Sequence, residues 1–359
     1  MGILIFLTML VASAHAVEDP YAELDNDESD PYSKFEKEIE ERDQAILKDI
    51  AQIEERWERF NASTIEDYYV YSKDGRVRRR ANFSDESPEK GFLEVAVVDA
   101  KSEKEAQKVL GKAVEKALRE KAGKQELLKD QVQLNQKPLT KKNVRRRAKE
   151  LKKQIQKTTV LTKKGKKIVY SVKLQFTPDH LKKRAQNYAK LVKKYARQFE
   201  IPSPLIFAVI HTESNFNPKA QSPANAHGLM QLVPTSGARD AYKKVYGKDK
   251  TVSPKYLYDP ENNIRLGTAY FAWLANQFKR AKNSDLRYHL MIAAYNTGAG
   301  NVSRAFIGKI RLSTAFTKIN SFTAREGYNH LLSNLPCYHG RCESRGYLKN
   351  VTNRMPLYR

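Results

Sequence analysis

The hydrophobic pattern of the 359-residue chain changes period near Thr177, and this change limits the fold to two differently built parts. After Thr177, apolar residues recur at helical spacing. Before it, three segments are rich in β-branched and aromatic residues, and the last alternates apolar with polar positions, which predicts strands with buried faces: 68–71, 92–98 and 168–176. We therefore predict an α+β fold, with a small N-terminal α+β domain over residues 61–178 and a mainly α-helical domain over residues 179–359.

Capping residues predict where three helices begin. Ser102, with Glu105 three residues later, predicts a capping box and a helix that runs to about residue 122. Ser203, followed by a proline, predicts a second helix. Asn262 or Asn263 is expected to start a third.

The N-terminus resembles an export signal. Ile3 to Val11 is a short apolar stretch, and small residues at Ala14 and Ala16 fit a cleavage site, so residues 1–16 are predicted to be a signal peptide. The stretch is too short to span a bilayer. Signal peptides usually begin with a positively charged region, and this segment has no Lys or Arg. The alternatives are therefore a misplaced start codon or a buried N-terminal strand. Export favours a periplasmic protein, with association with the outer membrane left open.

Charge is distributed unevenly along the sequence. Residues 17–60 carry 16 acidic against 6 basic residues, a net charge of −10, and are predicted to be an acidic linker followed by an amphipathic helix from about residue 34. Since the whole chain carries +24, residues 61–359 carry +34. A surface so basic favours a polyanionic partner, but charge alone does not distinguish nucleic acid, anionic lipid and peptidoglycan.

The basic run at residues 141–167 holds 13 Lys/Arg and one acid. It could contact an anionic polymer or a membrane peripherally, or be a solvated helix face or loop. The run lacks interleaved aromatic residues, so no nucleic-acid partner is expected.

Cys337 and Cys342 lie five residues apart. In an oxidising compartment they are expected to form a disulfide, and the alternative is two unpaired thiols. Only His339 lies close by, so a zinc site is not expected. No cofactor or metal motif is present in the sequence.

Glu213 is the residue that points most directly to chemistry. It follows Leu205–Ile210, an all-apolar segment that predicts a helix in the middle of a core. A carboxyl at the end of a buried helix is desolvated, which raises its pKa and suits it to donate a proton. Taken alone, Glu213 is better explained as a helix cap or as the partner of a lysine than as a catalytic acid.

Glu213 also begins an ordered set of short motifs. They are ESNFNP at 213–218, GLMQ at 228–231, AYNTGAG at 294–300, and ESR at 343–345 followed by Tyr347. In order and spacing, this set resembles the catalytic domain of the lytic murein transglycosylases related to goose-type lysozyme. The segment PDHLKKRA at 178–185, after a Tyr-Ser-Val strand, is similar to the membrane-bound lytic murein transglycosylase C group. Those enzymes are lipoproteins, and the lipidated cysteine is missing here.

The resemblance implies a lysozyme-like fold and a catalytic role for Glu213. Glu213 would cleave the MurNAc–GlcNAc β-1,4 bond of peptidoglycan as the single acid and base, with formation of 1,6-anhydro-MurNAc, in cell-wall remodelling or turnover. The resemblance also implies seven substrate-binding residues: Ser222, Met230, Gln231, Tyr295, Asn296, Glu343 and Tyr347. A hydrolytic muramidase of the same fold and a non-catalytic peptidoglycan-binding protein are the alternatives.

Overall fold

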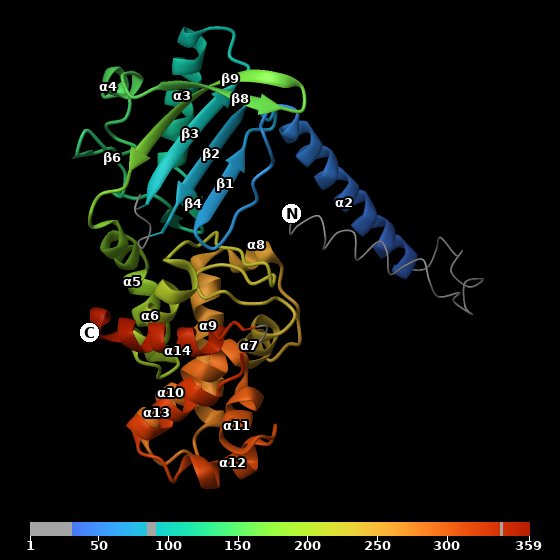
Figure 1. Cartoon of the computed structure of the whole chain (residues 1–359), viewed down its shortest axis with the longest axis vertical. Helices are drawn as coiled ribbons and strands as arrows, with labels where there is room; N and C mark the ends of the chain where they lie inside the picture. The colour runs from blue at the N-terminus through green and yellow to red at the C-terminus, as the bar shows by residue number, and fades with distance from the viewer. Residues whose placement is uncertain (1–30, 85–90, 338–339) are drawn as a thin grey trace.

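The computed structural model describes residues 31–84, 91–337 and 340–359. The predicted signal peptide at residues 1–16 and the first part of the acidic linker lie outside these residues. Figure 1 shows two parts stacked along the long axis of the molecule. We call residues 31–178 the sheet unit and residues 179–359 the helical unit. The predicted fold class, an α+β part followed by a mainly helical part, is confirmed.

The sheet unit is built on five antiparallel strands in the order β1-β2-β3-β9-β8. All three predicted strand segments are present. The sequence analysis missed β2 and β8. Strand β8 lies inside the basic run and forms a hairpin with β9. The strands are β1 (Asp67–Tyr71), β2 (Val77–Asn82), β3 (Phe92–Val98), β8 (Gln156–Thr162) and β9 (Gly165–Gln175).

Shorter elements complete the sheet unit. Helix α3 covers one face of the sheet and lies behind it in Figure 1, whereas α2 projects away from the body. The helices are α2 (Pro31–Glu54), α3 (Glu103–Leu118) and α4 (Ala148–Lys152). Two small ladders pair β4 (Lys121–Ala122) with β5 (Gln125–Glu126), and β6 (Gln133–Leu134) with β7 (Lys137–Pro138).

The two faces of the sheet are covered to different extents. Apolar residues of β2, β3 and β9 pack against α3 in the main core of this unit. On the other face, Trp57 is 2% exposed and covers Ala96, Val98 and Val169. The Trp57 indole Nε1 donates a hydrogen bond of 2.7 Å to the Gly75 carbonyl. The predicted amphipathic helix ends at Glu54, and Trp57, three residues later, lies against the sheet.

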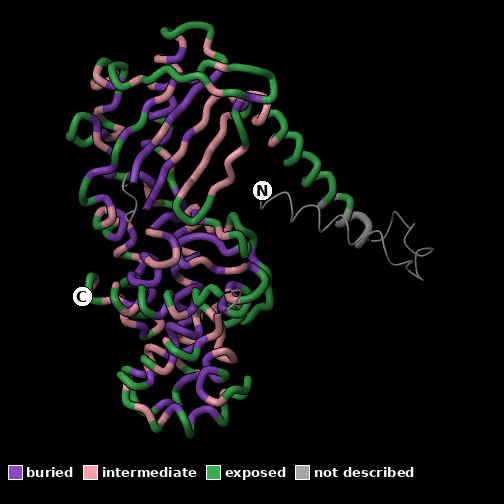
Figure 2. The backbone as a smooth tube through the Cα atoms, in the orientation of Figure 1, coloured by how far each residue is buried: buried purple, intermediate pink, exposed green. Residues whose placement is uncertain are grey.

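The helical unit contains ten α-helices and a final 3-10 turn among its described residues. Figure 2 shows its buried residues gathered in the middle, while α2 of the sheet unit is exposed. The helices are α5 (His180–Gln198), α6 (Ser203–Ser214), α7 (Gly237–Tyr246), α8 (Pro254–Leu257), α9 (Pro260–Gln277), α10 (Ser284–Thr297), α11 (Ala299–Ile307), α12 (Leu312–Ile319), α13 (Ala324–Asn334), α14 (Glu343–Arg354) and η1 (Met355–Tyr358). No helix of the described residues is long and apolar enough to cross a membrane.

The helix starts agree only in part with the capping residues read from the sequence. Ser102 caps α3 by accepting the Glu105 N–H at 3.2 Å, as predicted. The Glu105 carboxylate, however, accepts the N–H of Lys101, so the capping box is incomplete. Ser203 is the first helical residue of α6 and not its cap. The start predicted at residue 262 or 263 was wrong, because the Asp259 carboxylate already caps α9.

Direct hydrogen bonds join the two units. Most of them run from side chains of the helical unit to backbone carbonyls of the sheet unit, which makes the contact specific in position. The bonds are Arg184 Nη1 to Phe83 O at 2.8 Å, Asn187 Nδ2 to Glu126 O at 2.9 Å, Asn217 Nδ2 to Ile65 O at 3.0 Å, and Gln221 N to Thr64 O at 3.2 Å.

Candidate active site

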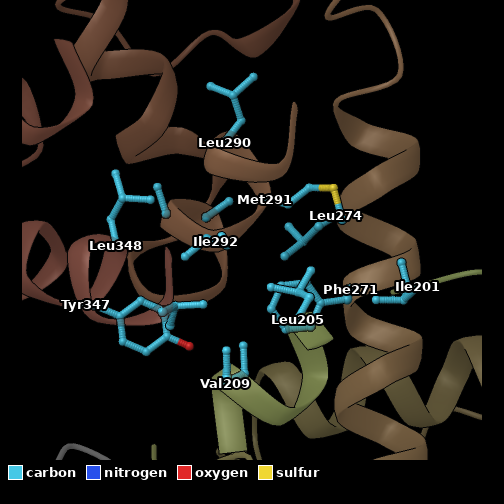
Figure 3. Close-up of a cluster of buried hydrophobic side chains, with 14 of the residues drawn as sticks. Ile201, Leu205, Val209, Phe271, Leu274, Leu290, Met291, Ile292, Tyr347 and Leu348 are labelled. Carbon is cyan, nitrogen blue, oxygen red and sulfur yellow. The ribbon is translucent and has the colours of Figure 1, made fainter. Parts of the chain in front are cut away.

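Helix α6 places Glu213 at the edge of the largest core of the molecule. All six residues of Leu205–Ile210 are buried, as the all-apolar segment predicted. Figure 3 shows Leu205 and Val209 of α6 among side chains from other helices. The helix ends at Asn215, which has a left-handed backbone with φ of 48°. The catalytic candidate therefore lies in the last turn of a helix that its own apolar residues hold in the core.

The environment of Glu213 favours the protonated acid. The residue keeps partial contact with solvent, but its carboxyl is packed deeply enough for desolvation to dominate. Burial raises the pKa of the Glu213 carboxyl from its usual 4.5 to about 8. A smaller interaction with the Tyr347 hydroxyl lowers this pKa, and the negative charge of Glu343 raises it. Since no cation is among these causes, the carboxyl holds its proton at neutral pH.

Two tyrosines, the half-buried Tyr295 and the buried Tyr347, flank the Glu213 carboxyl. The Tyr295 hydroxyl donates a hydrogen bond of 2.8 Å to the Met230 carbonyl, and its ring stacks on Phe271 with centroids 4.3 Å apart. Figure 3 shows Tyr347 with its hydroxyl directed toward α6. This hydroxyl is buried and makes no hydrogen bond of ordinary geometry among the described residues. Burial first, and then the charge of Glu213, raise the pKa of both tyrosines well above 10.0, so both remain O–H donors.

The side chain of Gln231 has an oxygen that accepts no hydrogen bond from the described residues, and its chain neighbour Met230 contacts Tyr295. The Gln231 Nε2 donates to the Gly228 carbonyl at 2.9 Å and to the Ala220 carbonyl at 3.2 Å. Its Oε1 is buried and has no partner within the described part of the chain. The neighbouring Met230 carbonyl accepts the Tyr295 hydroxyl, which ties Gln231 to the surroundings of Glu213. A buried oxygen without a donor suits a ligand N–H.

The structure assigns Met230 a different place from the one expected. Its side chain is fully buried in the core, so it has no surface to offer a sugar. A Cβ on Gly267 would lie 2.4 Å from the Met230 sulfur, which shows how closely the α9 backbone packs on it. The prediction that Met230 lines the sugar-binding surface is therefore corrected, because its side chain points into the protein and only its backbone faces Tyr295.

The other predicted residues lie at different depths. The Ser222 hydroxyl accepts the Ala226 N–H at 3.1 Å, so it closes a turn of the 215–232 loop. Asn296 is exposed next to Tyr295 in the last turn of α10, and Glu343 is exposed at the first position of α14. Glu213, Tyr295, Tyr347 and Glu343 are thus electrostatic neighbours, whereas no described contact joins Ser222 or Asn296 to Glu213.

Asn263 is a positioning residue to which the sequence analysis gave no role in the site. It is fully buried, and its Oδ1 accepts the Met230 N–H at 2.8 Å. Its Nδ2 donates to the carbonyls of His227 and Leu257, both at 2.9 Å. A Cβ on Gly228 would lie 2.4 Å from this Nδ2. Only glycine allows this approach, and the resulting bonds hold the loop segment that carries Gln231 against α9.

Cys337 and Cys342 are joined in a disulfide directly before α14. Cys342 is the residue that precedes the first turn of this helix. Arg345 Nε also donates to the Leu335 carbonyl at 2.8 Å, across the same loop. These links hold the start of the helix that presents Glu343 and Tyr347 to Glu213.

No cluster of three or more His, Cys, Asp or Glu side chains among residues 31–84, 91–337 and 340–359 could hold a metal ion.

The helical unit is similar to a known protein family. Residues 190–314, which include Glu213, Gln231 and Tyr295, match the family described as Transglycosylase SLT domain. The matched segment spans most of the helical unit, from within α5 to the start of α12, and we call it the SLT domain after this similarity.

Relatives of the SLT domain carry the name membrane-bound lytic murein transglycosylase C. The protein of that name from Sodalis glossinidius is 41% identical over 196 residues, which cover 54% of this chain and 53% of the relative. The Klebsiella pneumoniae protein is 40% identical over 197 residues, covering 54% and 52%. The chain therefore spans about half the length of the curated relatives it matches.

A solved structure is also similar. The 70 kDa soluble lytic transglycosylase from Escherichia coli is 32% identical, with 50% of this chain and 25% of that chain covered and a TM-score of 0.38.

Proposed function

We propose that this protein is a peptidoglycan lytic transglycosylase in which Glu213 is both the acid and the base. The observation that carries the proposal is the buried carboxyl of Glu213, whose pKa of about 8 keeps it protonated at neutral pH. A protonated carboxyl can donate to the oxygen between N-acetylmuramic acid and N-acetylglucosamine. The SLT domain and the names of the relatives support peptidoglycan as the substrate.

The reaction would proceed with one protein group and the substrate's own hydroxyl. Glu213 gives its proton to the glycosidic oxygen, and the bond from this oxygen to C1 of the muramic acid breaks. The 2-acetamido group of the substrate stabilises the positive charge on the sugar ring. The Glu213 carboxylate then takes the proton of the C6 hydroxyl, whose oxygen forms a new bond to C1. An attacking group tethered to the same sugar has a large effective molarity.

Other residues of the site would orient the sugar. The unpartnered Gln231 Oε1 can accept the N–H of an N-acetyl group. Tyr347 keeps its proton, so its hydroxyl can donate to the Glu213 carboxylate that forms during the reaction. Asn296 and Glu343 are exposed and available to the substrate, whereas Ser222 would act by shaping the 215–232 loop.

A hydrolytic muramidase is the second candidate, and Glu343 is the observation that favours it. Its charge is close enough to raise the pKa of Glu213, so a second carboxylate does stand near the acid. In a hydrolase with two carboxylates, such a group activates a water or acts as the nucleophile.

Mass spectrometry of the digestion products separates the two mechanisms. Purified peptidoglycan digested by the full chain should give muropeptides with anhydro ends, each lighter by one water than the reducing product of a muramidase. Treatment with borohydride provides the control, because it reduces ordinary sugar ends and leaves anhydro ends unchanged. Reducing ends as the only products would contradict the proposal.

We also infer that the protein acts in the periplasm, where peptidoglycan lies, in the remodelling or turnover of the cell wall. The predicted signal peptide supports this place of action.

A further inference from the structure

The β8–β9 hairpin carries two large apolar side chains in water. Leu161 is 68% exposed and Ile168 is 46% exposed. In the register of the hairpin, Leu161 pairs with Lys166 and Thr159 pairs with Ile168. Paired residues, and residues two apart on one strand, point to the same face of a sheet. Leu161 and Ile168 are therefore diagonal neighbours on one face, which is the face that α3 covers farther along the sheet.

Lysines surround this apolar pair on the same face. Lys166 is the cross-strand partner of Leu161, and Lys157 lies two positions before Thr159. Both are exposed, and neither forms an ion pair within the described residues. The Lys157 ammonium lies 5.8 Å from the ring centroid of Tyr170. Lys152 at the end of α4 and Lys153 next to it are also exposed, four and three residues before this strand.

The lysines in the turn and on the opposite face of the same hairpin have acidic partners. Lys163, Lys164 and Lys167 are ion-paired with acids of the sheet unit, and their charge is neutralised locally. The pairs are Lys163 with Glu54, Lys164 with Glu55 at 2.8 Å, and Lys167 with Asp99 at 2.7 Å. The basic run is thus divided, and unpaired lysines beside exposed apolar side chains occur on one face of the hairpin.

This combination matches an anionic lipid surface better than a soluble polyanion. A polymer of negative charge would use the lysines but would leave Leu161 and Ile168 in water. At a membrane, apolar side chains enter the boundary between headgroups and acyl chains while the lysine ammonium groups stay among anionic headgroups. Figure 1 shows the hairpin at the end of the molecule away from the helical unit, so a flat surface can approach it.

We propose that the face of the β8–β9 hairpin formed by Lys157, Leu161, Lys166 and Ile168 binds the surface of anionic membranes. This contact is separate from cleavage of peptidoglycan and does not depend on it. It would hold the sheet unit at the membrane with the active site at the far end of the molecule.

Sedimentation of the full chain with lipid vesicles tests the proposal. We expect binding to vesicles of phosphatidylglycerol and phosphatidylcholine, weaker binding at high salt, and little binding to phosphatidylcholine alone. Each lysine near an anionic surface contributes roughly a five-fold factor in affinity, so Lys157→Gln with Lys166→Gln should weaken binding about 25-fold. Lys279→Gln with Lys349→Gln, two exposed lysines of the helical unit, is the matched control and should bind like the unchanged protein.

A second variant distinguishes a membrane from any other polyanion. Leu161→Gln with Ile168→Gln keeps all lysines and should lose the part of vesicle binding that persists at high salt. Circular dichroism and peptidoglycan cleavage should stay unchanged in every variant, which shows that the fold is intact. Vesicle binding by this apolar variant equal to that of the unchanged protein would overturn the membrane proposal, as would a Lys157 and Lys166 variant equal to its control.

Discussion

The Glu213 carboxyl of the helical unit and the arginine-paired carboxyls of the sheet unit meet opposite environments. In the sheet unit, Glu105 accepts a hydrogen bond from Arg76 and Glu150 one from Arg147, and these contacts lower the pKa of both carboxyls. In the helical unit, the pKa of Glu213 rises because its carboxyl is buried without a cation. The difference shows that a carboxyl beside an arginine stays ionised, whereas a desolvated carboxyl without a neighbouring cation keeps its proton.

Replacing Glu213 should have the largest effect. Glu213→Gln keeps the shape of the side chain but removes the transferable proton, so kcat should fall by about 10²- to 10⁴-fold. Release of soluble muropeptides from purified peptidoglycan measures this change. Glu105→Gln, which removes a paired carboxyl of the sheet unit, is the control and should leave kcat unchanged. Equal activity of Glu213→Gln and Glu105→Gln would contradict the assignment of Glu213 as the proton donor.

Removing the buried cation between the units should have the next largest effect. The Arg184 guanidinium is 1% exposed and donates to the carbonyls of Phe83 and Asn215, two residues after Glu213. Arg184→Met leaves these carbonyls unsatisfied, and the free energy of unfolding should fall by about 2–5 kcal/mol. Urea denaturation of the full chain measures the loss, with the exposed Arg197→Met as control.

The Arg184→Met variant also tests whether a cation influences the pKa of Glu213. Arg184 is not among the groups that shift the pKa of Glu213. The folded Arg184→Met protein should therefore keep the pH dependence of cleavage unchanged. A shifted profile would mean that Arg184 does act as a cation on the Glu213 carboxyl.

The pH profile of cleavage tests the buried acid directly. Glu213 must be protonated to act, and burial raises its pKa to about 8, so kcat/KM should hold below this pH and fall above it. Above about pH 8 the loss should approach ten-fold per pH unit. A decline that already begins near pH 5 would show a carboxyl of ordinary pKa and would remove the contrast with the sheet unit.

The smallest effect concerns the carboxylate that faces Glu213. The charge of Glu343 raises the pKa of Glu213, so Glu343→Gln should move the alkaline decline to lower pH by a fraction of a unit. The position of the decline in kcat/KM is the measurement, since it is independent of how well substrate binds. Glu58→Gln, an exposed acid of the sheet unit, should not move it. A shift to higher pH after Glu343→Gln would contradict the assignment.

The position of Glu213 could be predicted because its cause is local. Leu205–Ile210 is apolar on every side, so a helix there must be central, and the first polar residues after it must lie at its edge. Met230 could not be placed in the same way. Whether a side chain in a loop points to solvent or to the core depends on its partner, here Gly267 on α9, which is distant in sequence.

The strand β8 was missed for a related reason. Its sequence is mostly polar, with three threonines and only two apolar residues, which are adjacent, so no alternating pattern identified it. Pairing with β9 supplies the order that the sequence of β8 alone does not. The role of Asn263 was not predicted, because asparagine occurs both as a buried hydrogen-bonding residue and as an exposed helix cap. Only the carbonyls that the fold brings around Asn263 distinguish the two roles.

The hydrogen bonds between the units restrict how this protein can exchange parts with its relatives during evolution. Asn217 and Gln221 lie in the same loop as Gln231 and are held by carbonyls of residues 64 and 65, ahead of the first strand. A chimera that joined this SLT domain to a foreign N-terminal half would have to present carbonyls at the same two places. Otherwise the loop that carries Gln231 would lose its outer support, although Glu213 and the helix that holds it remained.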